Sequence, residues 1–172
     1  MIEKNSRYIM QRIAKFEKVS EKQFLSDMQK QGLEADYAKI RLPLRATAGS
    51  AGYDFCTPVD FKLEPGQEIT IPTGIRAQMQ DGWVLVCCPR SGLGFKFRLQ
   101  LNNTVGIIDS DYYNADNEGH IMARLINDGR SGKTVELKAG QAFMQGLFLP
   151  YGITVDDEAG GLRTGGFGST NA

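Results

Sequence analysis

The 172-residue chain has no excess of charge of either sign, because 20 Lys and Arg residues balance 20 Asp and Glu residues. A strongly basic surface, which would attract nucleic acid or an acidic membrane, is therefore not expected. The sequence also lacks an apolar run long enough to span a bilayer, and residues 1–10 lack the apolar core of a signal peptide. We expect a cytoplasmic protein that binds neither nucleic acid nor membrane, and whose anionic ligands are bound by a few local cations and backbone N–H groups.

Cysteine and histidine are scarce. Cys56, Cys87 and Cys88 are odd in number and have no C-x-x-C spacing, which favours reduced core thiols over a metal site. The single histidine, His120, lies within a predicted strand, where packing or hydrogen bonding is a more common role than catalysis. The sequence has no P-loop, and no G-x-G-x-x-G segment follows a strand.

The N-terminal region has the pattern of one amphipathic helix. Ser20 to Gln23 has the form of a capping box, and Val19 and Phe24 stand at the positions of a hydrophobic staple. We predict a helix over 21–31, with Gly32 as its C-terminal stop. The simplest role for this helix is to cover one end of a sheet or barrel, and the alternative is a surface for a partner protein.

From Arg41 onward, short apolar stretches alternate with turn residues such as Glu64-Pro65-Gly66 and Asn127-Asp128-Gly129. Many short strands separated by glycine-rich turns predict an all-β sandwich or barrel and not a βαβ fold. The predicted strands cover 13–19, 68–71, 83–88, 99–101, 120–126, 134–137 and 144–149.

Three segments carry groups suited to a phosphate-bearing ligand. Pro89 to Gly94 follows an apolar strand and offers an Arg, a Ser and glycine N–H groups. The segment from Gly106 to Tyr112 contains Asp109 and Asp111, which strand alternation would place on the same face. One carboxylate could then act as a general base toward water, and the other could lie near a cation. The alternative for that segment is a surface turn. The glycine-rich tail, 160–170, is either a disordered end or an arm that folds over an anionic, aromatic ligand.

Five segments stand in order along the chain: 51–54, 89–92, 103–112, 140–150 and 163–170. Together they resemble the five motifs of trimeric dUTPases, and the resemblance runs from about Arg45 to the end. It implies an all-β, jelly-roll-like β-barrel of the β-clip type, with the short N-terminal helix added. It also implies a homotrimer with shared active sites and three regions: an N-terminal extension (1–44), a β core (45–159) and an arm that closes a neighbouring subunit's site (160–172).

The resemblance implies that the chain hydrolyses dUTP to dUMP and pyrophosphate, which keeps uracil out of DNA and supplies dUMP for dTMP synthesis. Asp109 would activate the water that attacks the α-phosphorus. Mg²⁺ would bind mainly to the phosphates and to waters, with Asp54 as a possible outer-shell partner. The resemblance also implies which residues contact the substrate. The phosphate chain would be bound by Arg90, Ser91, Gly92, Gln145, Arg163, Gly168, Ser169 and Thr170. The uracil would be recognised by Asn103, Gly106 and Ile108, with Phe167 stacked on its ring and Tyr112 packed under the deoxyribose.

The chain departs from the family pattern in four places. The turn after Tyr112 is longer than usual and occupies 113–119, and the N-terminal helix lies outside the common core. Ala142 stands where many members carry Arg, and only Thr164 separates Arg163 from the Gly-Gly-Phe-Gly run.

Two other functions compete with this prediction. The dCTP deaminases share the fold and use a glutamate to activate water at the base, and Glu118 in the insertion is the residue that keeps this alternative open. A regulatory protein partner is the other alternative, for a phage-encoded member of the family. The N-terminal helix and the insertion are the natural places for such a partner.

Overall fold

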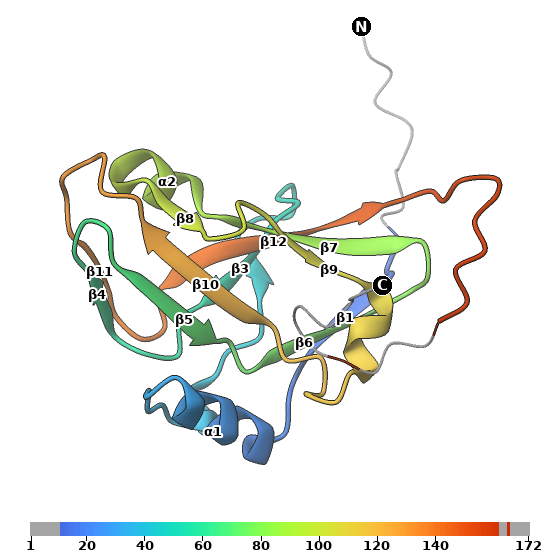
Figure 1. Cartoon of the computed structure of the whole chain (residues 1–172), viewed down its shortest axis with the longest axis horizontal. Coiled ribbons are helices and arrows are strands. Elements are labelled where there is room, and N and C mark those ends of the chain that lie inside the picture. Colours follow the sequence, from blue (N-terminus) through green and yellow to red (C-terminus); the bar gives the residue numbers. More distant parts are fainter. Residues whose placement is uncertain (1–10, 162–164, 166–172) are drawn as a thin grey trace, which may run out of the picture.

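The computed structural model describes residues 11–161 and residue 165. The described chain is mostly β-sheet, and every strand pairing in it is antiparallel (Figure 1). The strands are β1 (Ala14–Lys18), β2 (Leu44–Arg45), β3 (Tyr53–Cys56), β4 (Phe61–Leu63), β5 (Glu68–Pro72), β6 (Ile75–Met79), β7 (Trp83–Pro89), β8 (Leu99–Leu101), β9 (Gly106–Ile108), β10 (Met122–Asn127), β11 (Val135–Leu137) and β12 (Ala142–Pro150). The helices are α1 (Glu21–Lys30) and α2 (Ser91–Phe97), with 3₁₀ turns η1 (Tyr37–Lys39) and η2 (Ser110–Asn114).

The largest sheet has the strand order β2-β3-β12-β7-β9. A three-stranded sheet, β5-β10-β8, and the pairs β1-β6 and β4-β11 complete the described strands. The core lies between these layers, because strand alternation turns one face of each inward. In β6, for example, Ile75, Ala77 and Met79 are buried, whereas Arg76 and Gln78 are not. Fully burying a large apolar side chain contributes about 1.5–3 kcal/mol relative to its exposure.

The long apolar strands are where the sequence predicts them. The predicted strand over 99–101 matches β8, and 83–88 and 144–149 lie within β7 and β12. The predicted strand over 120–126 is wrong at its start, because β10 begins at Met122. The strands β2, β3, β4 and β6 were not predicted.

Helix α1 begins as predicted and ends at Lys30, one residue earlier than expected. The hydroxyl of Ser20 accepts a hydrogen bond from the backbone N–H of Gln23 at 3.1 Å, and Val19 and Phe24 are fully buried as a staple requires. The other half of the capping box is wrong. The carboxylate of Glu118 accepts from the backbone N–H and the hydroxyl of Ser20, at 2.7 and 2.6 Å, and the amide of Gln23 donates to Asp27 instead. A charged acceptor binds these donors more strongly than a neutral amide does.

His120 is completely buried and holds α1 against the sheets. The backbone N–H of Gly74 donates to its Nε2 at 2.8 Å, so the ring is neutral and its Nδ1–H donates to Asp27 at 2.7 Å. Burial lowers the pKa of His120, and this effect outweighs the opposing contact with Asp27. The prediction that this histidine is packed and hydrogen-bonded is therefore confirmed, although it does not lie in a strand.

Because the unfolded chain binds a proton at His120 more readily than the folded chain does, acid should destabilise the fold. His120 contributes its full stability above its ordinary pKa of 6.5 and loses it as the pH falls below that value. We expect the free energy of unfolding, measured in urea at a fixed protein concentration, to fall between pH 7.5 and pH 5.5. His120→Gln should show a clearly smaller fall. An equal fall in both proteins would contradict this account.

Candidate active site

Three predicted site residues lie on adjacent strands of the largest sheet. Gln145 on β12 pairs with Asp54 on β3 and with Cys88 on β7. Arg90 follows β7, and its Nε lies 3.3 Å from a carboxylate oxygen of Asp54. Because the side chains of Arg90 and Asp54 are 46% and 30% exposed, a ligand can reach both. The structure therefore brings Asp54, Arg90 and Gln145 together at one end of the sheet.

Gly52 makes room for one member of this group. A Cβ atom at this position would stand 2.6 Å from Oε1 of Gln145. The glycine in Ala51-Gly52-Tyr53-Asp54 therefore lets the amide of Gln145 lie against the chain that leads into β3. The motif 51–54 marks Gly52 in the sequence, but Gln145 lies ninety-three positions further along the chain, so only the fold shows that the two residues are in contact.

The segment after β7 is a short helix. Pro89 is the last residue of β7, Arg90 precedes the first turn, and α2 begins at Ser91. The first N–H groups of a helix have no acceptor within it and are available to an anion. A hollow of about 350 Å³ adjoins this turn, lined by Arg90, Ser91, Gly92, Leu93, Leu137, Gln141 and Ala142.

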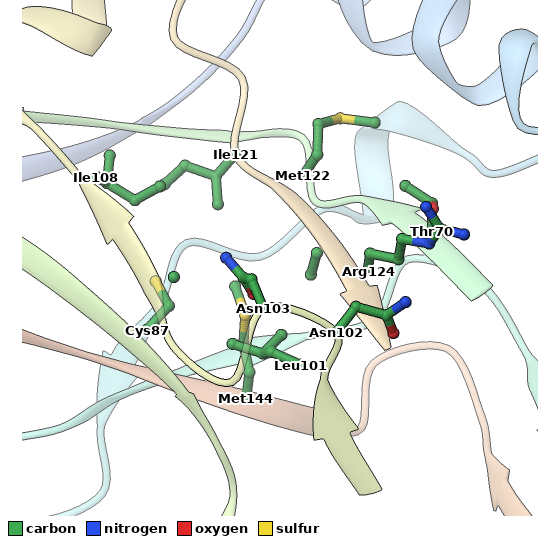
Figure 2. A pocket seen from close by; sticks show the side chains of 12 residues that line it. Thr70, Cys87, Leu101, Asn102, Asn103, Ile108, Ile121, Met122, Arg124 and Met144 are labelled. Atoms are coloured by element: carbon green, nitrogen blue, oxygen red, sulfur yellow. The ribbon is translucent and has the colours of Figure 1, made fainter. Parts of the chain in front are cut away.

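A second group lines a cavity of about 380 Å³ beside the hairpin between β8 and β9 (Figure 2). Asn103 extends its amide into this cavity, and Gly106 and Ile108 form part of its wall. The rest of the lining is largely apolar, and burial raises the pKa of the Cys87 thiol to about 12, so this thiol stays protonated. A mostly apolar cavity with a few polar groups, among them the amides of Asn102 and Asn103, suits a flat, polar-edged ring. Sequence patterns missed Cys87 and the other apolar lining residues, because they read as ordinary core: Leu101, Ile121 and Met144.

Asp109 and Tyr112 lie beyond the end of β9. The strand stops at Ile108, Asp109 is extended (φ −76°, ψ 158°), and η2 begins at Ser110. The expectation that Asp109 and Asp111 share one face of a strand is therefore wrong, because a 3₁₀ turn has no such alternation. Tyr112 is buried, donates its hydroxyl hydrogen to the carbonyl of His120 at 2.8 Å and accepts from the amide of Asn117 at 2.7 Å.

Within one chain, Asp109 lies far from the group of Arg90, Asp54 and Gln145. On β7, Leu85 pairs with Ile108, whereas Cys88 pairs with Gln145. At a rise of about 3.3 Å per residue, these two positions are roughly 10 Å apart along the strand. In Figure 1, α2 and η2 accordingly lie at opposite ends of the long strands. The described part of one chain therefore carries two separate groups of candidate site residues.

Several predicted site residues lie outside the described residues, namely Arg163, Phe167, Gly168, Ser169 and Thr170. Over residues 11–161, no group of three or more His, Cys, Asp or Glu side chains is placed to hold a metal ion. In the same range, no helix has the length and apolar character needed to cross a membrane.

Comparisons with known proteins agree with the motifs. A family model described as dUTPase matches residues 38–171. The chain is 43% identical over 138 residues to the deoxyuridine 5'-triphosphate nucleotidohydrolase of Lactococcus lactis, an alignment that covers 78% of this chain and 91% of that protein. The crystal structure of a Streptococcus mutans dUTPase matches with a TM-score of 0.63 and 37% identity, covering 81% of this chain and 97% of that one.

A more distant structural match shares the fold. It is a mutant dUTPase from phage phi11 of S. aureus, described for its coordination of a structural Mg(II) ion. Its TM-score is 0.62 at 19% identity, and the match covers 85% of this chain and 95% of that one. With the family model spanning most of the residues and a relative above 40% identity, the chain belongs to the dUTPase family, whose members are dUTP diphosphatases.

Proposed function

We propose that the chain hydrolyses dUTP to dUMP and pyrophosphate by attack of an Asp109-activated water on the α-phosphorus, within a homotrimer of jelly-roll-like barrels. The observation that carries the proposal is the separation of Asp109 from Arg90 along β7. Because Arg90 and Asp109 lie near opposite ends of β7, a single chain does not place both beside the same phosphate group. A neighbouring subunit that supplies Asp109 next to Arg90, Asp54 and Gln145 completes the site.

The segment after β12 supports an assembly. Tyr151, Ile153 and Val155 alternate along it and are all at least half exposed. Exposed apolar side chains at every second position are typical of a strand whose partner lies on another chain. A second copy of this chain would cover them, and this arrangement would carry residues 160–172 away from their own core.

Phosphate binding falls to the end of the sheet that holds Arg90. Its guanidinium offers a planar set of donors, and the hydroxyl of Ser91 and the backbone N–H groups of Ser91 and Gly92 add more. The ion pair between Arg90 and Asp54 holds the guanidinium beside these donors before the substrate binds. Gln145 lies on the next strand and orients either a phosphate oxygen or the attacking water.

The donor set fits Mg²⁺ held mainly by the substrate. This ion keeps several waters and binds through one or two carboxylates together with phosphates. Asp54 offers one partly exposed carboxylate, already shared with Arg90, which suits contact through a metal-bound water. When bound, Mg²⁺ would neutralise part of the phosphate charge, while Asp109 holds the water and takes its proton.

Base and sugar recognition falls to the cavity and its surroundings. The amide of Asn103 and the backbone from Gly106 to Ile108 match the polar edge of uracil within a mostly apolar wall. Tyr112 packs under the deoxyribose and excludes a 2′-hydroxyl. The arm completes the site, with Phe167 stacked on the base and with Arg163, Gly168, Ser169 and Thr170 against the phosphates.

The contacts of Glu118 argue against the alternative of a dCTP deaminase, for which this residue was the candidate. The carboxylate of Glu118 is committed to Ser20 at the start of α1, through bonds of 2.7 and 2.6 Å. Its pKa is lowered by these bonds, so it serves as a structural acceptor. A regulatory protein partner stays a prediction, as does the cytoplasmic location.

A panel of deoxynucleoside triphosphates tests the proposal, together with a mass measurement in solution. We expect pyrophosphate release from dUTP with Mg²⁺, little release from dTTP or dCTP, no ammonia from dCTP, and a particle of three 19.0 kDa chains. A hydrophobic or hydrogen-bonded site that fits its substrate can discriminate by about 10²-fold or more. A monomer with full activity would overturn the shared site, and ammonia release would overturn the reaction.

A further inference from the structure

The insertion over 113–119 is bonded to the N-terminal segment. The hydroxyl of Tyr113 donates to Glu17 on β1 at 2.5 Å, and Arg76 on β6 bonds the same carboxylate at 3.2 Å. The guanidinium of Arg76 also stacks on the ring of Tyr113, 4.3 Å from its centroid. These contacts hold the end of η2 against β1 and lower the pKa of Glu17 to about 2, mainly through its hydrogen bonds from Lys15 and Tyr113.

The far end of the insertion turns back sharply on η2. Glu118 and Gly119 are both left-handed, with φ of 58° and 68°. A Cβ atom on Gly119 would stand 2.7 Å from the carbonyl oxygen of Tyr112 and from Cα of Tyr113, so only glycine fits there. The left-handed backbone at Glu118 is strained for a residue with a side chain, and its two bonds to Ser20 hold it in place.

A second connection runs from α1 to Tyr112 through His120. Asp27 accepts from the imidazole of His120 at 2.7 Å, and the carbonyl of His120 accepts from the hydroxyl of Tyr112 at 2.8 Å. Asp27, His120 and Tyr112 are all buried, so water does not compete for these bonds. Helix α1 is thus connected to η2 twice, by Glu118 at its start and by Asp27 in its interior.

We propose that α1 and the insertion set the position of Asp109 and Tyr112, with Glu118 and Asp27 as positioning residues of the active site. The inference rests on the roles proposed above for Asp109 and Tyr112. Both β1 and α1 precede residue 38, where the match to the family model begins. The support that β1 and α1 give to η2 therefore lies outside the part of the chain that the family model matches, and it reaches the turn that follows Asp109.

The physical reason is the shortness of η2. It spans five residues, and a 3₁₀ turn of this length has little rigidity of its own. Its geometry depends on what is bonded to it, which includes Glu17 of β1 on one side and His120 on the other. A displacement of about 1 Å at a reacting group can cost up to about 10²-fold in rate, even when the mutation is remote.

Two matched pairs of variants of the full chain test the inference. Glu118→Ala removes the acceptor of Ser20, whereas Glu21→Ala removes an exposed carboxylate from the first turn of the same helix. Asp27→Ala removes the partner of His120, whereas Lys30→Ala removes only the exposed lysine on the other oxygen of Asp27. The readouts are kcat and KM for dUTP, the dUTP-over-UTP ratio of kcat/KM, and the mass in solution.

We expect Glu118→Ala and Asp27→Ala to lower kcat about tenfold and to reduce the preference for dUTP over UTP by a similar factor, at an unchanged trimer mass. Glu21→Ala and Lys30→Ala should stay within about twofold of the parent. Glu118→Gln, which keeps one acceptor, should recover part of kcat and part of the preference.

The outcomes separate the two proposals. If the parent protein fails to release pyrophosphate from dUTP, the proposed function is wrong. If the parent is active and the trimeric fractions of Glu118→Ala and Asp27→Ala keep its kcat and its sugar preference, the positioning role is wrong. Equal losses in Glu21→Ala would also overturn it, because they would reflect general weakening of the helix.

Discussion

Replacing Asp109 with asparagine is expected to lower kcat for dUTP by about 10²-fold or more, because a positioned general base contributes about 10²–10⁴-fold. Asparagine has the shape of aspartate but cannot accept a proton from water. Binding of a non-hydrolysable dUTP analogue should change by no more than a few fold, because the phosphates are held from the other end of the sheet. Steady-state kinetics and calorimetric titration of the analogue measure the two effects.

The neighbouring carboxylate provides the control for this variant. Asp111 lies in η2, two residues after Asp109, and is exposed. Asp111→Asn removes the same charge and should keep kcat within about threefold of the parent. A value near the parent for Asp109→Asn, or equal losses in both variants, would contradict the assignment of the base to Asp109.

The two helices show where sequence patterns predict structure and where they do not. Helix α1 was predictable, because Ser20 caps it and Val19 and Phe24 bury a staple next to the cap. Helix α2 was not, because Gly92 and Gly94 have low helix propensity. Its formation depends on neighbouring chain segments, and a single sequence does not display those contacts.

The candidate site shows the same division. Sequence motifs identified Asp54, Arg90, Gln145 and Asp109, but no local pattern places them relative to one another. Their separation follows from strand register, which sets Cys88 beside Gln145 and Leu85 beside Ile108. The bond between Glu118 and Ser20 joins residues 98 positions apart. The support of η2 by the N-terminal helix could therefore not be predicted from local sequence patterns either.

Removing the arm is the second change for which we expect a large effect. A chain that ends at Gly161 lacks Arg163, Phe167, Ser169 and Thr170 but keeps every described strand. We expect a folded trimer whose kcat/KM for dUTP falls by about 10²-fold or more, because closing a site orients the substrate and excludes water. Solution mass and thermal unfolding, measured beside kinetics, separate this outcome from a failure to assemble. Loss of the trimer would make the arm a structural element instead.

Mixing the two inactive chains tests the shared site directly. Trimers co-expressed from Asp109→Asn and the truncated chain contain sites in which a truncated subunit supplies Asp109 and a variant subunit supplies the arm. If base and arm come from different subunits, random assembly of equal amounts should restore about a quarter of the parent's activity per site. If one subunit supplies both groups, every site lacks one of them and activity stays at the level of the separate variants. Recovery therefore requires that Asp109 and the arm meet across a subunit interface.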